Sequence, residues 1–321
     1  MFYRRNILAL LGAIFGVGMG PLSAAEQWLE EDYTTILNNV KAVHMSGVSG
    51  SVALLGRRAF PLAISTQNKV VVAAGYFGDQ PRGGRLVAMT HTSFADGNSE
   101  DAALFLGNLA RWAGRSGRPR LVCVGAATKG WEAAGVQTTL AAGNLKEILS
   151  EADVAVVNLH NGTMKDAAEE LTKFAGAGGG VILIATPWAA PGPQLEAGNE
   201  LLGRAGLTML GAGGKEAAYP VKEQTPSAYW SALNAIDAAV AYRRGLIKLD
   251  PADLQLCAAS IDAALSAKTL SPELQSAVNY LNRAFGRIDP GSVATAKGKA
   301  DKPLDAAIAR YQARMPGSVA Q

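Results

Sequence analysis

The chain has few cysteines and histidines and lacks the short motifs on which many hydrolytic sites are built. Its 321 residues include 2 cysteines and 3 histidines. No His-Glu-x-x-His stretch is present, which excludes a zinc peptidase centre of that type from these residues. Gly-x-Ser-x-Gly and Cys-x-x-Cys are absent too, so neither a nucleophile elbow nor a dithiol site is predicted. Cys123 lies in the apolar run Leu121–Val124, and we expect a buried free thiol there.

The glycines do not form a phosphate-binding loop. Gly213-Gly214-Lys215-Glu216 lacks the hydroxyl residue that would hold magnesium. Gly178-Gly179-Gly180 precedes a predicted strand, whereas a phosphate cradle needs the order strand, glycines, helix. We therefore expect these three glycines to end a helix and to turn the chain into a sheet. No cofactor and no metal site is predicted.

A large excess of one charge is also missing. The formal net charge of +3 falls to +1 once Arg4 and Arg5 are subtracted, because both lie in a segment that we expect to be removed. The lysines and arginines are scattered, and no basic stripe alternates with aromatic residues. A nucleic-acid partner is therefore not predicted. The content of 49% hydrophobic and 18% charged residues is typical of a folded globular protein.

The N-terminus has the pattern of a secretory signal peptide. Arg4 and Arg5 precede an apolar run from Ile7 to Met19, which is followed by small residues up to Ala25. A membrane anchor would need about 20 apolar residues, and this run is shorter. The arginine pair also permits a twin-arginine signal. We predict a signal peptide over residues 1–25, export to the periplasm or beyond, and no membrane contact after cleavage.

Short apolar runs predict a mostly parallel sheet covered by helices. Six runs of four to six residues do not alternate polar with apolar side chains, as is typical of strands buried on both faces. Helical spacing in Asp101–Ala113 and Met164–Ala175 supplies covering helices. Pro61 and the Gly83-Gly84 turn indicate an antiparallel hairpin at one edge. The six runs are Ser51–Leu55, Lys69–Ala74, Leu86–Thr90, Leu121–Val124, Val154–Leu159 and Val181–Ala185.

Further helices are predicted before and after this sheet. Residues 27–43 form one predicted helix, and a cluster of Gly and Pro near 212–226 marks a boundary. We predict an α/β domain over residues 26–222 and a small all-α domain with a linker over 223–321. The helices expected in the second domain are Tyr229–Tyr242, Ala252–Leu265, Pro272–Phe285 and Leu304–Arg314.

Polar and aromatic residues gather where three predicted strands end. Ligands of open parallel sheets bind beyond the carboxyl ends of the strands, so we expect these residues to line one crevice. A histidine at a strand end is often a hydrogen-bonded structural residue, and we assign none of them as catalytic. The six candidates for binding are His91, Asp96, Asn158, His160, Thr186 and Trp188.

Aromatic residues provide one way to bind a ligand in this crevice. Trp188, with Tyr76, Phe77 and His91, can offer flat faces for stacking on a sugar ring. The alternative, which we favour, is that Trp188 covers the core.

Four segments occur in an order that resembles a known family. They are Leu54-Leu55-Gly56 leading to Val72-Ala73-Ala74-Gly75-Tyr76-Phe77-Gly78, then Gly84-Arg85-Leu86-Val87-Ala88-Met89-Thr90-His91, Leu106-Gly107-Asn108-Leu109-Ala110-Arg111-Trp112, and the stretch from Phe174 to Trp188. This order is similar to the amidotransferase-like domain that precedes the catalytic part of enhancin-like, mucin-active zinc metallopeptidases. It also resembles the related domains of vertebrate cold-channel-associated factors. The resemblance covers roughly residues 45–210.

The resemblance implies a flavodoxin-like core of the class I glutamine amidotransferase type. In active members of that superfamily, the strand after the glycine-rich turn presents a cysteine nucleophile. The corresponding Ile184-Ala185-Thr186-Pro187-Trp188 contains no cysteine, and Pro187 and the missing elbow glycine argue against Thr186 as a substitute. Glutaminase activity is therefore not expected.

The family's peptidase domain would follow the helical segment, but its zinc motif does not occur before Gln321. From the resemblance we expect a non-catalytic accessory or binding module of an exported enhancin-like zinc metallopeptidase that acts on glycoproteins or cell-surface polymers. The expected partners are a glycan or glycoprotein and a downstream peptidase domain. The alternative function is that of a hydrolase in which His91 or His160 forms an acid–base pair with Asp96.

Overall fold

The computed structural model describes residues 24–161, 164–222 and 224–267, with residues 276, 277, 279, 280, 283, 305 and 309. The predicted signal peptide up to residue 23, and most of the helices predicted at 272–285 and 304–314, lie outside these residues. Within the described part of the chain, no helix combines the length and apolarity that crossing a bilayer requires.

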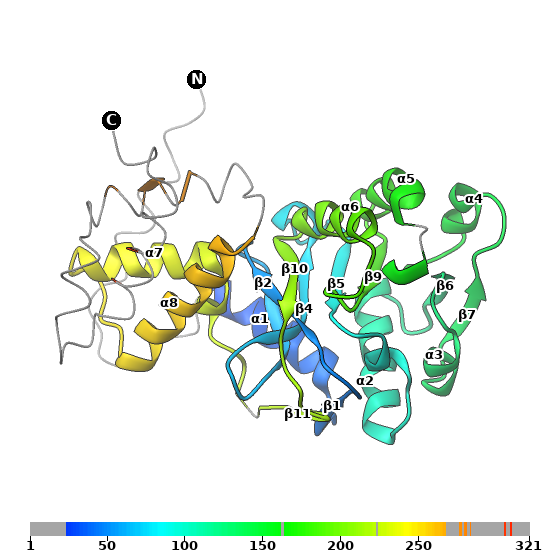
Figure 1. Cartoon of the computed structure of the whole chain (residues 1–321), viewed down its shortest axis with the longest axis horizontal. Coiled ribbons are helices and arrows are strands. Elements are labelled where there is room, and N and C mark those ends of the chain that lie inside the picture. The colour runs from blue at the N-terminus through cyan, green and yellow to red at the C-terminus, as the bar shows by residue number, and fades with distance from the viewer. Residues whose placement is uncertain are drawn as a thin grey trace.

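A seven-stranded sheet forms the centre of the fold, with the strand order β3-β4-β5-β9-β8-β6-β7 (Figure 1). In this spatial order, the last five strands (β5, β9, β8, β6 and β7) run parallel to one another. β3 and β4 add an antiparallel hairpin at one edge, as predicted. Valine and isoleucine dominate the central strands because β-branched side chains pack well on a sheet surface. The strands are β3 (Phe60–Ile64), β4 (Val70–Tyr76), β5 (Arg85–Met89), β6 (Arg120–Val124), β7 (Gln137–Leu140), β8 (Val154–Asn158) and β9 (Gly180–Ile184).

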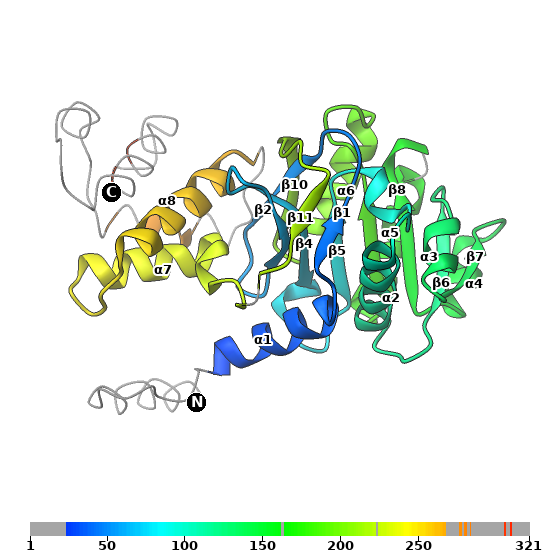
Figure 2. The same ribbon diagram turned by 90° about the horizontal axis from the view of Figure 1, so that it is seen from below.

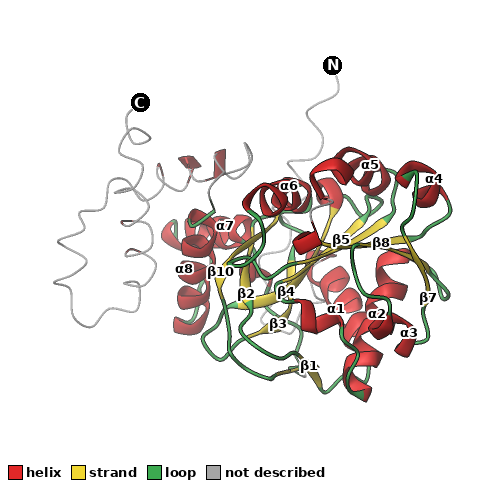
Figure 3. Ribbon diagram, turned by 45° about the vertical axis from the view of Figure 1, so that its right-hand side comes forward, coloured by secondary structure: helices red, strands yellow, loops and turns green. Residues whose placement is uncertain are grey.

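Helices cover both faces of this sheet, which confirms the predicted α/β class with a mostly parallel sheet (Figure 3). One face packs against α1 (Ala24–Leu37), α2 (Glu100–Gly114) and α3 (Lys129–Ala133), through residues such as Leu106 and Trp131. The other face packs against α4 (Leu145–Ser150), α5 (Met164–Gly176) and α6 (Gly192–Gly203), through residues such as Leu171 and Leu202.

Two small two-stranded sheets complete the α/β part. β2 (Gly50–Leu54) pairs antiparallel with β10 (Leu207–Ala212), and this ribbon contacts β4. β1 (Ala42–His44) pairs antiparallel with β11 (Ala218–Pro220). The outer face of the β2–β10 ribbon packs against α7 (Ala232–Arg243) and α8 (Pro251–Leu265), which form a helical hairpin at one end of the molecule (Figure 2).

The structure corrects the predicted helix over residues 27–43. α1 ends at Leu37, and Asn39 has a left-handed φ of 59°, so the chain turns before it enters β1. The apolar residues Val40 and Val43, which extended the helical pattern, are buried by this turn and by β1 instead. The prediction for Gly178-Gly179-Gly180 is confirmed, because α5 ends at Gly176, Gly178 has a φ of 104°, and β9 begins at Gly180.

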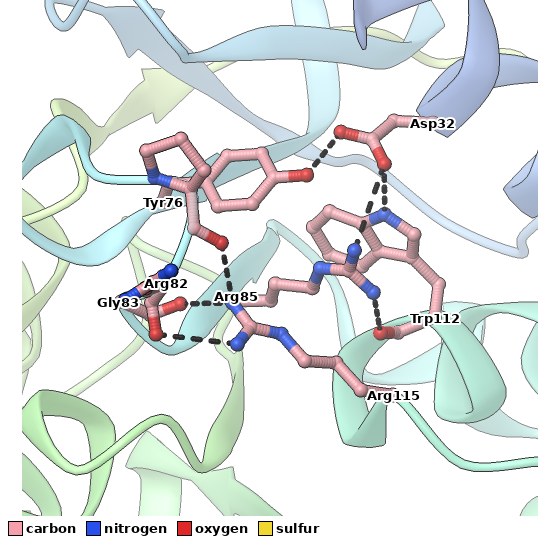
Figure 4. A network of polar contacts seen from close by, with 8 residues as sticks. Asp32, Tyr76, Arg82, Gly83, Arg85, Trp112 and Arg115 are labelled. Carbon is pink, nitrogen blue, oxygen red and sulfur yellow. Dashed lines mark hydrogen bonds and ion pairs between the residues drawn. The ribbon is translucent and has the colours of Figure 1, made fainter.

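A buried polar cluster fastens α1 to the amino end of β5 (Figure 4). Asp32 accepts hydrogen bonds from the Tyr76 hydroxyl and from Trp112 Nε1, the latter at 2.8 Å, and lies 3.9 Å from Arg85. The Arg85 guanidinium also stacks 4.8 Å from the centre of the Trp112 ring. Burial, and then the hydrogen bond to Asp32, raise the pKa of Tyr76 to about 12. The cluster is structural, and it lies at the opposite end of β5 from His91.

Candidate functional site

The carboxyl edge of the sheet contains two positions where neighbouring strands lead to opposite faces. β5 leads to α2 and its neighbour β9 leads to α6, while β8 leads to α5 and its neighbour β6 leads to α3. These helices lie on opposite faces in each pair. Such switch points leave a crevice beyond the strand ends, and ligands of open α/β sheets bind there. Asn158 is the last residue of β8, and the other five candidates lie on the segments that leave β5, β8 and β9.

His91 is held as a hydrogen-bonded part of the turn after β5. Its Nδ1 accepts a hydrogen bond from the Ser93 backbone N–H at 3.1 Å and lies 2.7 Å from Ser93 Oγ. Its Nε2 faces Gly47, where a Cβ atom would approach this nitrogen to 2.9 Å. Burial lowers the pKa of His91, Asp96 acts to raise it and His160 to lower it further. Asp96 and His160 each lie close enough to His91 to act on its charge.

His160 ties the ends of β8 and β9 together. Its Nε2 accepts a hydrogen bond from the Thr186 backbone N–H at 2.9 Å, and its own backbone N–H donates to Asn158 Oδ1 at 3.0 Å. The structure therefore brings three predicted residues into one hydrogen-bonded group. Thr186 is 5% exposed, so its side chain is not presented to a ligand.

Trp188 is the most accessible aromatic candidate at this edge. It follows β9, and 58% of it is exposed, so the favoured interpretation that it covers the core is wrong. Its loop is held in shape, because the backbone N–H groups of Ala189 and Ala190 both donate to the Thr186 carbonyl oxygen at 2.8 Å. The adjoining Pro187 is buried. The indole is thus a solvent-facing side chain on a fixed turn.

The stacking partners proposed for Trp188 lie elsewhere. Tyr76 pairs with Arg85 at the amino end of β5 and belongs to the Asp32 cluster. Phe77 packs against the core near Gly84. Both are therefore removed from the crevice, because β5 runs its full length between them and His91.

Asp96 lines a neighbouring pocket of about 220 Å³. Ser46, Ser93, Asn98 and Ser99 supply further polar groups to its wall. Sequence reasoning missed this contribution from residues 44–46, because the segment is nearly fifty positions away from Ser93 along the chain. The contact is made by the Ser46 N–H, which donates to Ser93 Oγ at 2.9 Å.

The site offers little for covalent or metal chemistry. Cys123 and Cys257 are free and buried, and burial raises the pKa of the Cys123 thiol to about 11. The thiol of Cys123 therefore stays protonated near neutral pH, as a structural residue does. Among the described residues, no group of three or more His, Cys, Asp or Glu side chains is placed to hold a metal ion.

The sequence of this chain matches the model of a known protein family. A family model described as the TRPM8 N-terminal domain, TCAF_N, matches residues 19–224, which is more than half of the 321 residues. The chain belongs to this family. The TCAF_N match covers the seven-stranded sheet and both small sheets, and it ends just beyond β11.

Individual relatives of this TCAF_N chain are distant and longer. A TRPM8 channel-associated factor homolog from Danio rerio is 26% identical over an alignment of 221 positions, which covers 62% of this chain and 22% of the relative. The chain thus spans about a fifth of the length of that curated relative.

Solved structures of the IMPa metallopeptidase from Pseudomonas aeruginosa share the fold. One has a TM-score of 0.55 and 14% identity, over 88% of this chain and 36% of the other. A second, in complex with an O-glycopeptide, has a TM-score of 0.56 and 13% identity over 92% and 38%. A third, in complex with T-antigen, has a TM-score of 0.52 and 13% identity over 88% and 34%. The fold of this chain is therefore shared with about a third of the length of IMPa.

Proposed function

We propose that this chain is a non-catalytic binding module of an exported, metallopeptidase-related protein, and that it recognises a glycan or glycoprotein at the carboxyl edge of its sheet. Its core is of the amidotransferase type without the nucleophile, and a peptidase domain is its partner. Trp188 provides the stacking surface, and His91, Asp96 and His160 supply polar groups at the same edge of the sheet.

The exposure of Trp188 carries this proposal. An aromatic side chain that is 58% exposed loses apolar contact with the core, and a fixed loop lowers the entropy cost of using it for binding. A tryptophan face suits the apolar face of a sugar ring, and the indole N–H can donate to a hydroxyl. The related IMPa structures were solved with an O-glycopeptide and with T-antigen, which supports this class of ligand.

The hydrogen bonds of the two candidate histidines support the non-catalytic part of the proposal. His91 Nδ1 and His160 Nε2 both accept backbone hydrogen bonds that hold turns in place. A general base needs a ring nitrogen within reach of substrate. The hydrolase alternative retains one supporting observation, which is that Asp96 and His160 each act electrostatically on His91.

Binding of an O-glycopeptide, measured by calorimetry, tests the proposal. We expect Trp188→Ala to weaken binding roughly three- to tenfold, the value of one aromatic contact, and Trp188→Phe to keep part of the affinity. Leu140→Ala is the matched control, because Leu140 is 62% exposed at the same edge but on the outer strand β7.

Two results would contradict the glycan proposal. One is the absence of binding by the unmodified chain. The other is an equal loss of affinity in the Trp188→Ala and Leu140→Ala variants, since this would mean that the effect does not depend on the crevice. Turnover of the glycopeptide by the purified chain would instead favour the hydrolase.

A further inference from the structure

The turn between α7 and α8 exposes two neighbouring aliphatic side chains. Leu246 is 69% exposed and Ile247 is 37% exposed, which makes this the place in the described residues where large apolar side chains adjoin in solvent. Single exposed apolar residues are common on protein surfaces, but an adjacent pair at a projecting turn calls for a physical reason.

The way in which α7 ends does not explain why Leu246 and Ile247 are exposed. Gly245 has a left-handed φ of 70°, its N–H donates to the Tyr242 carbonyl, and the Leu246 N–H donates to the Ala241 carbonyl, both at 2.9 Å. In this helix-ending motif the residue after the glycine frequently packs back on the last turn. Leu246 instead remains 69% exposed. The apolar faces of both helices are already buried against β2 through residues such as Ile236 and Ile261.

Positive charges surround the two aliphatic residues. Arg243 and Arg244 precede them and Lys248 follows, and all three are exposed. The one carboxylate within residues 243–250 is that of Asp250, which caps α8 by accepting a hydrogen bond from the Asp253 N–H at 2.8 Å. Three cations and one carboxylate give residues 243–250 a charge of +2.

We propose that this turn, residues 243–250, binds the surface of a bilayer that carries anionic headgroups. Leu246 and Ile247 enter the interfacial layer, while the cations contact headgroup phosphates. The turn lies at the far end of the helical hairpin from the sheet, so a flat surface can reach it without contacting the rest of the α/β part (Figure 2). A stable protein partner would need about 1,000 Å² of buried area, which a narrow tip does not offer.

This binding is peripheral and independent of the glycan proposal. It departs from our expectation of no membrane contact after loss of the signal peptide, which was based on the length of apolar segments and did not consider surface turns. The test needs a chain that starts at Ala24, because the apolar run at residues 7–19 would itself enter lipid. This chain keeps every described element, and its three buried clusters contain no residue before Leu29.

Co-sedimentation with vesicles measures the binding. We expect the chain to sediment with vesicles of phosphatidylcholine and phosphatidylglycerol, and not with phosphatidylcholine alone. The double variant Leu246→Ser and Ile247→Ser should bind about tenfold more weakly, and Lys248→Glu should weaken binding by a smaller factor that shrinks in high salt. Leu140→Ser is the control, because it removes a comparably exposed leucine from the end of β7, a strand that lies at the opposite end of the molecule from α7 and α8 (Figure 1).

The proposal fails if the chain does not prefer phosphatidylglycerol vesicles, or if Leu140→Ser lowers sedimentation as much as the double variant. Sedimentation that is lost in Lys248→Glu but unchanged in the double variant would also overturn it, because binding would then be electrostatic attraction without insertion. Each variant lies at an exposed position, and an unchanged thermal unfolding curve shows that the fold is intact.

Discussion

At the scale of single residues, His91 illustrates how a histidine at a strand end can serve the fold. Its Nδ1 accepts the Ser93 N–H, so this nitrogen must be unprotonated for the hydrogen bond to exist. The pKa of His91 is lowered mainly by burial, with His160 adding to the effect and Asp96 opposing it. Neutral His91 therefore stabilises the fold, because its protonation removes the hydrogen bond from the Ser93 N–H.

This assignment predicts a pH dependence of stability. A base whose pKa is lower in the folded state stabilises the protein fully above its unfolded pKa of 6.5, and the stabilisation is lost as the pH falls below that value. We expect the free energy of unfolding to decrease as the pH falls below 6.5, and to decrease less in His91→Asn, which keeps an acceptor but does not titrate. Urea unfolding at several pH values measures this difference. Parallel curves for the two proteins would contradict the structural role.

At the scale of elements, the Asp32 cluster joins α1 to β4, β5 and α2. Asp32 is 8% exposed and serves as the acceptor for Tyr76 and Trp112, with the Arg85 guanidinium close by. Removal of this carboxylate would leave a buried indole N–H and a partly buried guanidinium without their partner. Such groups lose their hydration on folding and are costly when they are unpaired.

We predict that Asp32→Ala lowers the free energy of unfolding by about 2–4 kcal/mol. Glu31→Ala is the matched control on the same helix, and we expect it to change stability by less than about 0.5 kcal/mol because Glu31 is exposed. Chemical denaturation measures both. Equal effects of the two substitutions would mean that α1 is held by its apolar face alone, through residues such as Leu29 and Ile36.

The elements that sequence reasoning found are those with a strong local pattern. The central strands were predictable because strands buried on both faces leave continuous apolar runs, and α2 and α5 because their apolar residues recur at helical spacing. The three-residue strands β1 and β11 have no such pattern, since they are defined by pairing with each other across the chain. The end of α1 was missed for a similar reason, because apolar residues of the next turn and strand continue its spacing.

The candidate site was predictable in its position but not in its contacts. The rule that ligands bind beyond carboxyl ends placed His91, His160 and Trp188 on one edge, as the structure has them. The hydrogen bond from the Thr186 N–H to His160, and the approach of Gly47 to His91, depend on loops that only the folded chain brings together. The exposure of Trp188 also had no local signal, because a tryptophan after a buried strand is as compatible with a core cap as with a surface platform.

At the scale of the whole molecule, β2 belongs to two apolar cores at once. Val52 and Leu54 point into the core between the sheet and α4–α6, and Ala53 and Leu55 belong to the core with α7 and α8. The alternation of side chains along a strand makes this sharing possible. We propose that the boundary between residues 222 and 223 separates the α/β domain from the helical domain along the sequence. We also propose that the described parts of the two domains unfold together, because both pack against β2.

Adjacent residues on α7 provide the test. Ile236 is 1% exposed in the core with β2, whereas Asp237 is 49% exposed in its side chain and pairs with Arg57 on the surface. We expect Ile236→Ala to cost about 2–4 kcal/mol through lost burial and a cavity. Asp237→Ala should cost less than about 1 kcal/mol, because exposed ion pairs contribute little.

The same denaturation curves decide whether the helical hairpin is an independent unit. Four of the five tryptophans, at positions 28, 112, 131 and 188, lie in the α/β part, so fluorescence reports mainly on that part and circular dichroism reports on all helices. If β2 couples the two cores, both signals change in one transition, and Ile236→Ala shifts both midpoints equally. A circular dichroism change that precedes the fluorescence change, and that alone moves in Ile236→Ala, would show that α7 and α8 unfold separately from the sheet.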